Sequence, residues 1–556
     1  MNTTTLQKAK TFKERMEQLY HYIADKESLN QSKETILFLS LGTLEHRAIV
    51  FHVKANSFQK SWTKLVHLGE SFISKQSHDF PYIKIDIVKN TEALSVFEFI
   101  KRLTQTKRYY FRYGVSFDQN FNHAFLEQEL NGNAVLKYDK QNKRAFIDEK
   151  NLQLYIKKHR PNLPALDFNK VSSVQLFQTK GYFLADEKCY ELHMDERNNG
   201  RRNTALTKEE IVSMVQASQQ YLTHLVHEDG RFTYGYFSCF DREIEHYNTL
   251  RHCSTLYAMC ESYEFLPNED LKVAITSGIQ YLVETYITTN DNEHEAFLLE
   301  QIPGGYEIKL GGNAAAILAL TKFTTVFKNE QYLDLANALA NGIKRMQQPD
   351  GSFVHILDFP SLKMKQAYRT IYYDGEAAFA LMRLYHLSEN AEHLQMVQHA
   401  FDYFIANDYW KNHDHWLSYC TNELTIYCSE EKYFQFGLQN VAGRLDYIYQ
   451  RITTYPTFLE LTVAAHRMVE RLKQTNSRHL LDNFDEDKLV KTIQKRAEYQ
   501  RNGFFYPELA IYHKRPARIM GAFFIRHHTF RTRIDDVEHN LSGYIAYYDA
   551  FLSSVE

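Results

Sequence analysis

Two short stretches of the sequence combine residue types that can transfer protons. "YYDGEAAFALMRLY" (372–385) places Asp374 and Glu376 before an apolar run with helical spacing, and "RTRIDDVEHN" (531–540) places Asp535, Asp536 and His539 beside arginines. Two carboxylates held apart could act as general acid and base in glycosidic bond cleavage. A tyrosine or histidine facing a uronate could instead abstract the proton next to its carboxylate, which leads to epimerisation or elimination.

Both stretches also have a purely structural explanation. Acids in the first turn of a helix are stabilised by the helix dipole, so Asp374 and Glu376 could simply cap a helix. "RTRIDDVEHN" could equally be a solvated, salt-bridged turn, and surface ion pairs of that kind contribute little. The sequence leaves both explanations open.

Other polar residues stand at similar places in "HYNTLRH" (246–252), "LGGN" (310–313) and "TNEL" (421–424). The "YNTLRH" cluster could also be inter-helix packing around a satisfied histidine. Arginines favour an anionic substrate, because guanidinium grips a carboxylate or phosphate in two places. The predicted catalytic residues are Asp374, Glu376, Asp535, Asp536 and His539. The predicted substrate-binding residues are Tyr247, Asn248, Arg251, His252, Asn313, Tyr372, Tyr373, Glu423, Arg531 and Arg533.

A repeat positions these residues. "LRHCSTLYAMCESY" (250–263), "LGGNAAAILALTKF" (310–323) and "YYDGEAAFALMRLY" (372–385) each pass from polar or glycine residues through small ones to an apolar turn, and they start 60 and 62 residues apart. Weaker copies follow at 421–434, 454–468 and 538–551. "HLVHEDGRFTYGY" and "RMQQPDGSFVHIL" end preceding helices in Asp-Gly, where the glycine permits a left-handed turn. Small-residue helices pack closely, so we expect them to form the inner layer of a double-layered helical array.

Helical hairpins of this length with "QxPDGSF"-type turns resemble the (α/α)6 toroids. These include unsaturated-glucuronyl hydrolases, N-acylglucosamine epimerases, the C-terminal domains of glucuronyl C5-epimerases, lanthionine cyclases and terpene cyclases. The resemblance covers about residues 205–556, matches no single family, and implies architecture rather than one reaction, because the fold hosts many. It implies that the N-terminal ends of the inner helices, where the candidate residues stand, surround a common cavity.

The first 190 residues follow a different pattern. Short alternating runs such as "ETILFLSLG" and "YIKIDIVKN" are separated by helical stretches, which predicts a mixed domain of α+β or α/β type without a recognisable phosphate loop. We predict an α/β domain of unknown role over 1–193, a linker over 194–210 with a helix N-cap in "TALTKEE", and a toroid over 211–556. The fold class is α+β overall and mainly α.

Composition limits the partners. The 65 basic and 68 acidic residues give a net charge of −3, so no overall field favours nucleic acid. The polar first 30 residues lack the apolar segment of a signal peptide, and no run approaches 18 apolar residues, so we expect a cytoplasmic protein without a membrane span. Six cysteines form no CxxC pair, and the signatures of zinc-binding lanthionine cyclases and of terpene cyclases are absent. The histidines of "NHDHW" (412–416) and the cysteines Cys253, Cys260, Cys420 and Cys428 leave a metal site open as an alternative, and we predict neither a metal nor another cofactor.

The prediction is therefore a carbohydrate-active enzyme acting on an acidic or N-acetylated bacterial glycan, with hydrolysis, epimerisation and elimination all open. The alternative is a non-catalytic or peptide-directed binding or assembly protein built on a helical toroid. Clustering separates the two: Arg251, Asp374 and Asp535 on one rim within a cleft would favour the enzyme, and scattering over the outside would favour the binding protein. Substrate identity and oligomeric state do not follow from the sequence.

Overall fold

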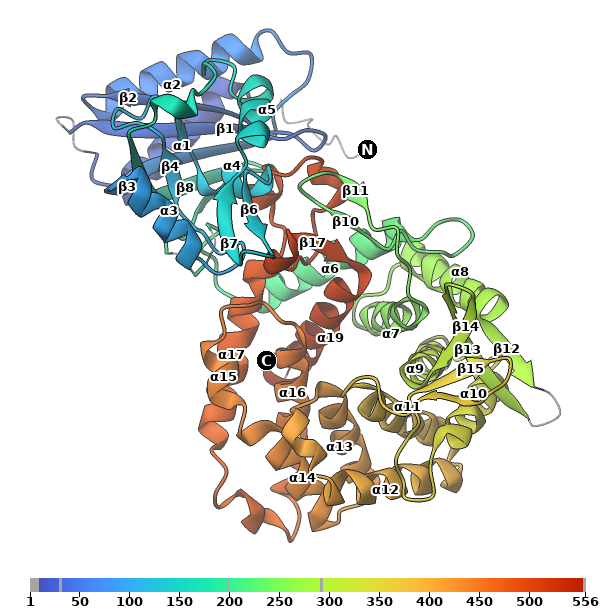
Figure 1. Ribbon diagram of the computed structural model, residues 1–556. Coiled ribbons are helices and arrows are strands. Elements are labelled where there is room, and N and C mark those ends of the chain that lie inside the picture. Colours follow the sequence, from blue (N-terminus) through green and yellow to red (C-terminus); the bar gives the residue numbers. More distant parts are fainter. Residues whose placement is uncertain (1–9, 30–32, 196, 199, 291–293, 554–556) are drawn as a thin grey trace, which may run out of the picture.

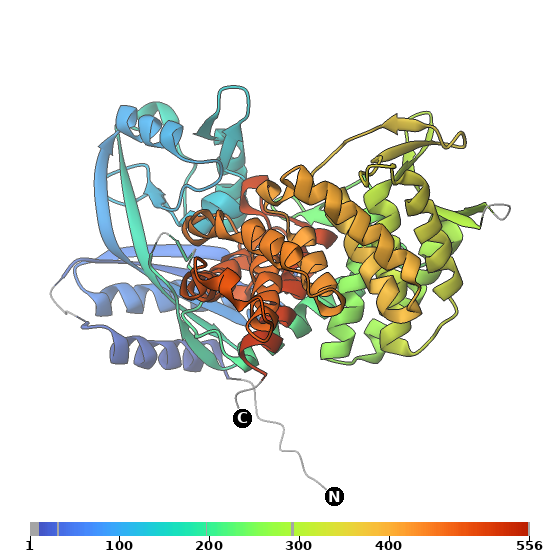
Figure 2. The same ribbon diagram turned by 90° about the horizontal axis from the view of Figure 1, so that it is seen from below.

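The computed structural model describes residues 10–29, 33–195, 197–198, 200–290 and 294–553. A mixed α-β region formed by the first 190 residues lies against a ring of helices formed by the rest of the chain (Figure 1). The view turned by 90° shows the same two parts side by side (Figure 2).

The N-terminal region is built on an antiparallel sheet. Its spatial order is β2 (Ile49–Ala55), β1 (Thr35–Gly42), β3 (Tyr82–Ser95), β8 (Ser173–Ala185), β4 (Gly114–Ser116) and β5 (Ala124–Phe125), and β9 (Lys188–Glu191) pairs with β8. Every pairing is antiparallel, so this region is α+β rather than a parallel α/β domain. A separate hairpin joins β6 (Leu136–Asp139) and β7 (Arg144–Ile147).

Helices α1 (Phe12–Lys26) and α2 (Phe58–Ile73) pack on this sheet through a buried apolar core that includes Leu37, Leu39 and Trp62. Thr11 and Ser57 start the two helices, because each side-chain oxygen accepts a hydrogen bond from a free backbone N–H of the first turn. The remaining helices of this region are α3 (Val96–Gln105), α4 (Glu127–Gly132) and α5 (Glu149–His159).

Six helices of the described chain form a closed inner ring. Each contacts the next, and the last contacts the first: α7 (Thr249–Phe265), α9 (Leu310–Phe327), α11 (Tyr373–Ser388), α13 (His415–Tyr427), α16 (Thr457–Leu472) and α19 (Ile534–Phe551). Six others pack outside them: α6 (Lys208–Leu225), α8 (Glu269–Tyr286), α10 (Leu333–Met346), α12 (Ala391–Ala406), α14 (Glu431–Ala442) and α17 (Glu486–Gln500). The predicted (α/α)6 toroid is confirmed (Figure 1).

The predicted repeat coincides with inner helices at α7, α9, α11, α16 and α19. The weak copy at 421–434 is misplaced, because the inner helix α13 begins earlier, at His415, and the copy runs on into α14. The two Asp-Gly turns are left-handed as predicted, with φ of +90° at Gly230 and +91° at Gly351. A Cβ at these positions would lie 2.1 Å from the Ser277 carbonyl oxygen and 2.3 Å from that of His399, so only glycine fits.

Strands also occur inside the toroid, where the sequence indicates almost only helices. One sheet contains β12 (Ile287–Asn290), β13 (Glu295–Ile302), β14 (Gly305–Lys309), β15 (Ile356–Phe359) and β16 (Met364–Gln366), and another contains β10 (Gly235–Phe237), β11 (Arg242–Glu243) and β17 (Arg531–Arg533). They form the links between outer and inner helices, and β14 and β17 lead directly into α9 and α19. Two short helices, α15 (Leu445–Gln450) and α18 (Pro507–Ala510), complete the elements used below.

The N-terminal sheet and the toroid meet through buried polar contacts. Lys84 of β3 forms a buried ion pair with Asp86 at 2.9 Å and lies 3.4 Å from the hydroxyl oxygen of Tyr512, which follows α18. The predicted linker carries Arg202, which binds Glu508, and Thr207, which caps α6 as expected. The domain limits of 193 and 211 stay a prediction.

One helix of the described chain, α9, is long and apolar enough to cross a membrane by length and composition alone. However, 78% of that segment is buried inside the protein. It contains Ala314, Ala315 and Ala316, all buried, and it contacts both neighbouring inner helices. This burial is what the closely packed inner layer of the toroid requires.

Candidate active site

A cavity of about 420 Å³ opens at the N-terminal ends of the inner helices. Its wall combines first-turn residues of α7, α11, α13 and α19 with the segments around 455 and 525–533. Ten of the predicted residues line it: Asn248, Arg251, Tyr372, Tyr373, Glu376, Arg531, Arg533, Asp535, Asp536 and His539.

Three arginines and two aspartates form a tight network on one side of the cavity. Asp535 Oδ2 accepts hydrogen bonds from Arg251 Nε at 2.6 Å and Arg533 Nη2 at 2.5 Å, and Arg531 binds both oxygens of Asp536 at 3.1 Å. Burial alone would raise the pKa of Asp535, but Arg251 and Arg533 outweigh it and hold that pKa well below its ordinary range. Burial and the charge of Asp535 raise the pKa of Asp536 to about 6. Three guanidinium groups against two carboxylates leave one net positive charge, which suits an anionic ligand.

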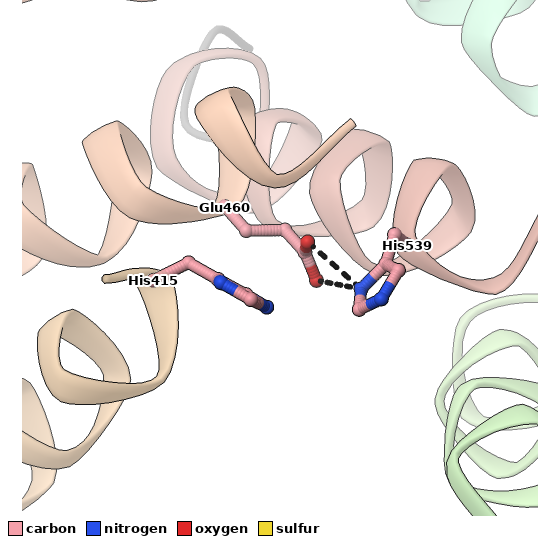
Figure 3. Close-up of side chains that lie close together, drawn as sticks. All are labelled: His415, Glu460 and His539. Atoms are coloured by element: carbon pink, nitrogen blue, oxygen red, sulfur yellow. Dashed lines mark hydrogen bonds and ion pairs between the residues drawn. The ribbon is translucent and has the colours of Figure 1, made fainter. Parts of the chain in front are cut away.

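A second cluster joins α13, α16 and α19 (Figure 3). His539 Nδ1 lies 3.0 Å from Glu460 Oε2, and the Tyr419 hydroxyl donates to Glu460 Oε1 at 3.2 Å. Burial alone would lower the pKa of His539, but the carboxylates of Glu460 and Glu538 outweigh it and raise that pKa to about 10. His539 therefore carries a proton and a positive charge at neutral pH.

His415 is the electrostatic opposite of His539. Its ring lies edge-on to that of His539, with centroids 5.3 Å apart, and its Nδ1 lies 3.2 Å from Asp414 Oδ1. Burial lowers the pKa of His415 to about 3, so this imidazole is neutral. Its Nε2 is buried without a hydrogen-bond partner among the described residues. One charged and one neutral imidazole thus stand together at the cavity wall.

The same cluster has a composition that suits a metal ion. His415, Glu460 and His539 each offer one ligand atom, and these atoms lie within 4.8 Å of one another. Two imidazoles and one carboxylate form a common ligand set for zinc in catalytic sites. In the structure, however, protonated His539 forms an ion pair with Glu460, and a metal would have to displace that proton.

Two glutamates with raised pKa values stand at the cavity. Burial, together with the charge of Asp414, raises the pKa of Glu376 to about 8, and its Oε2 has no hydrogen-bond partner among the described residues. Burial raises the pKa of Glu538 to about 8 as well, and Ser254 Oγ donates to its Oε2 at 2.7 Å. Both side chains therefore hold a proton at neutral pH.

Asp374 and Asn313 stand at inner-helix openings but do not line the cavity. The carboxylate of Asp374 is 1% exposed and lies 3.0 Å from His355 Nε2. Asn313 Oδ1 accepts a hydrogen bond from the backbone N–H of Leu298 in β13 at 2.8 Å. In the structure each side chain therefore binds the segment that connects an outer helix to the next inner helix.

Three further candidates also lie outside the cavity wall. The Tyr247 hydroxyl lies 2.8 Å from His252 Nδ1, and His252 Nε2 lies 3.0 Å from the carbonyl oxygen of Gly278, so this pair packs α7 against α8. Glu423 lies in the last half of α13, at the other end of the ring, where its carboxylate is 3.6 Å from Arg383.

The structure adds residues to the cavity that the sequence did not single out as site residues. His415, Trp416, Tyr455, His528 and Glu538 line it, and Glu460 stands behind His539. The repeat was the signal that could have identified them: His415 and Trp416 open α13, Glu538 stands within "RTRIDDVEHN", and Glu460 lies in the weak copy at 454–468.

The sequence matches no protein-family model, and no curated protein matches it. Among solved structures, a cellobiose 2-epimerase from Bacillus thermoamylovorans is similar over 61% of this chain and 99% of its own, with 12% identity and a TM-score of 0.47. A D-mannose isomerase covers 62% and 99%, with 11% identity and a TM-score of 0.48. An α-1,6-mannanase from Salegentibacter covers 60% and 98%, with 10% identity and a TM-score of 0.40. With TM-scores below 0.5, these likenesses carry no weight for the reaction, which is inferred from the side chains.

Proposed function

We propose that the cavity is the active site of a carbohydrate-active enzyme that works by proton transfer on an acidic or N-acetylated sugar. The observation that carries this proposal is charged His539 at the wall of a cavity that also holds Asp536, which is ionised at neutral pH, together with protonated Glu376 and three arginines. General acid–base catalysis needs one group that gives a proton and one that takes it, both within reach of the same sugar.

Epimerisation is the first candidate reaction. A base removes the proton from a carbon next to a carbonyl or carboxylate, and an acid on the opposite face returns one, which inverts that carbon. The network of three arginines and two aspartates carries one net positive charge. This charge would bind the acid group of the substrate and stabilise the negative charge that develops beside it. In this scheme Asp535 is a positioning residue, because two guanidinium groups hold its carboxylate.

Glycoside hydrolysis is the second candidate, and Glu376 favours it. Its pKa of about 8 makes it a protonated general acid at neutral pH, as protonation of a glycosidic oxygen requires. Asp536, whose pKa of about 6 leaves it ionised at neutral pH, would then act as the base on the attacking water. Trp416, Tyr372 and Tyr455 give either reaction an aromatic wall on which a sugar ring can lie.

A single screen separates the reactions from one another and from a non-catalytic binding protein. Purified protein is incubated in D₂O with a panel of uronates, N-acetylated sugars and neutral oligosaccharides, and each product is analysed by mass spectrometry. Epimerisation adds one deuterium without other change, hydrolysis adds water across a bond, and elimination yields an unsaturated product that absorbs in the ultraviolet. Turnover by the wild type but not by His539→Gln supports the proposal. If no sugar reacts at any concentration while the protein stays folded, the cavity is not an active site of this kind.

A further inference from the structure

One part of the cavity wall, at Tyr455, is also exposed on the protein surface. Tyr455 and His528 both line the cavity. The Tyr455 hydroxyl oxygen lies 3.3 Å from Nε2 of His527, and the two rings stack edge to face at 5.4 Å. Tyr455 and His527 therefore mark the point where the cavity wall continues onto the surface.

The N-terminal region supplies the next part of this surface. Arg526 Nε donates a hydrogen bond to the carbonyl oxygen of Tyr109 at 2.6 Å, and Thr529 Oγ1 donates to the Tyr109 hydroxyl at 3.0 Å. These bonds fix residues 107–110 beside the segment that carries His527 and His528. Lys107 is exposed there, and the guanidinium of Arg108 lies 5.5 Å from the ring centroid of Tyr109.

The toroid supplies the opposite part, around α15. The guanidinium of Arg451 lies 5.0 Å from the ring centroid of Tyr447 and 5.8 Å from that of Tyr455. Tyr447 and Tyr455 are each 37% exposed. We call Lys107, Arg108, Tyr447, Arg451, Tyr455 and His527 the outer track.

The cations of the outer track lack carboxylate partners. Within the described residues, no ion pair involves Lys107, Arg108 or Arg451. Their side chains contact aromatic rings, and Arg451 also binds the Thr453 hydroxyl. They lie close enough to act on one another: burial and then the charge of Arg451 lower the pKa of Lys107. Burial, and with it the charges of His528, Arg108, Lys107 and Arg451, lowers the pKa of His527 to about 3. These cations therefore stand together beside Tyr455, at the edge of the cavity wall.

We propose that the outer track binds the non-reacting acidic sugars of a polyanionic glycan chain while its reacting sugar occupies the cavity. Unpaired guanidinium and ammonium groups bind carboxylates or sulfates, and half-exposed tyrosines provide flat surfaces for sugar rings. The cavity carries four carboxyl groups, which hydrogen-bond well to sugar hydroxyls and poorly to a phosphodiester backbone, and this favours a glycan over a nucleic acid. The proposal deepens the proposed function and gives the N-terminal region a part in substrate binding.

The test compares binding of long and short anionic chains without any need for turnover. Isothermal titration with polygalacturonate and with trigalacturonate is carried out on the wild type and on the variant Lys107→Ser/Arg108→Ser/Arg451→Ser. We expect this variant to bind polygalacturonate about tenfold more weakly, because it loses three ion contacts that are each weak at the surface. Its affinity for trigalacturonate should stay near that of the wild type, and its salt dependence should be shallower, because fewer counterions are released.

The matched control removes three exposed lysines from α2 and α5, in Lys60→Ser/Lys64→Ser/Lys157→Ser. It changes the net charge equally and should leave polygalacturonate binding unaltered. If both variants lose the same affinity for polygalacturonate, the effect is one of overall charge and the proposal is overturned. Neutral dextran that binds as tightly as polygalacturonate would also overturn it. Poly(U) binding more tightly than polygalacturonate, with the same loss in the track variant, would assign the track to nucleic acid instead.

The two proposals fail in different ways. Charge-dependent chain binding without turnover of any sugar would remove the proposed reaction and keep the outer track. The opposite result is turnover of small sugars together with an affinity that depends neither on chain length nor on the three cations. It would support the proposed reaction and contradict the outer track.

Discussion

The first turns of α9 and α19 hold equivalent places in the ring and have opposite roles. Each follows directly on a strand, β14 or β17. At the start of α9, Gly311 has no side chain and so leaves room for Glu376 and Tyr373 of α11. These two residues line the cavity, and Gly311 does not. At the start of α19, Asp535, Asp536 and His539 themselves reach the cavity. A place in the repeat thus locates a residue on the ring, and the neighbouring side chains decide whether it reaches the cavity.

The largest expected effect comes from α19. We expect His539→Gln to lower kcat by about 10²- to 10⁴-fold, the usual contribution of a general acid or base. Glutamine keeps an N–H donor for Glu460 but cannot deliver a proton, so sugar binding should change little. It also leaves the buried Glu460 carboxylate without its counter-charge, so the thermal unfolding midpoint should fall. Steady-state kinetics and calorimetry on the same preparation measure both quantities. A fall in binding that matches the fall in turnover would make His539 a binding residue instead.

Glu376 offers a test through pH. Its pKa is raised from 4.5 to about 8 in the folded protein, so its stabilising contribution is complete below pH 4.5 and is lost as pH rises through 8. Each pH unit in this window should cost about 1.4 kcal/mol of unfolding free energy relative to Glu376→Gln, which does not titrate. Urea denaturation of both proteins at several pH values between 5 and 8 measures the slope. A constant difference across this range would contradict the burial of an uncompensated carboxyl group at the cavity.

Asn313 of α9 should differ from His539 in its effect on turnover. Asn313→Ala removes the acceptor for the backbone N–H of Leu298, and an unpaired buried donor costs about 1–3 kcal/mol. We expect the unfolding free energy to fall by that amount while kcat per folded molecule stays within about twofold, since the side chain does not reach the cavity. Kinetics corrected for the folded fraction check this, and a specific loss of kcat would give α9 a direct part in the chemistry.

Adjacent glycines of α9 sharpen the contrast further. A Cβ at Gly311 would lie 2.0 Å from Glu376 Oε2 and 2.5 Å from the Tyr373 ring, whereas a Cβ at Gly312 would lie 3.2 Å from Leu298 Cδ2. We expect Gly311→Ala to displace Glu376 and cost about 1–3 kcal/mol by overpacking, with a parallel loss of activity. Gly312→Ala is the matched control and should cost less and keep activity. If the two substitutions lower stability and activity equally, the space that Gly311 leaves beside Glu376 is not what either property depends on.

The ring could be predicted from the sequence because its cause is local. Small residues at regular intervals and Asp-Gly turns such as the one at Gly351 appear in the chain itself, and close helix packing follows from them. The strands between outer and inner helices were missed, because β13 and β14 are held by pairing and by the position of α9 rather than by a strong alternating pattern.

The site could be predicted only in part, for geometric reasons. Asp374 and Glu376 are two residues apart, which places them on roughly opposite sides of a helix, so only one of them can face the cavity. Nothing in the sequence indicates that this is Glu376, because Asp374 is held by His355 from the preceding link. Glu460 and His415 become important only through their contacts with α19, and such contacts between distant helices are not visible in a single sequence.

The smallest expected effect separates the two chemical roles open to His415, Glu460 and His539. We expect dialysis against a chelator to leave kcat unchanged within about twofold, because the Glu460–His539 ion pair is complete by itself and a bound metal would have to displace its proton. Metal content measured on the dialysed protein confirms that any ion has been removed, and the Glu460→Gln variant shows whether the cluster binds zinc at all. Activity that disappears with the metal and returns on addition of zinc would turn the cluster from a proton-transfer pair into a metal centre, and α19 would then differ from α9 by holding an ion rather than a proton.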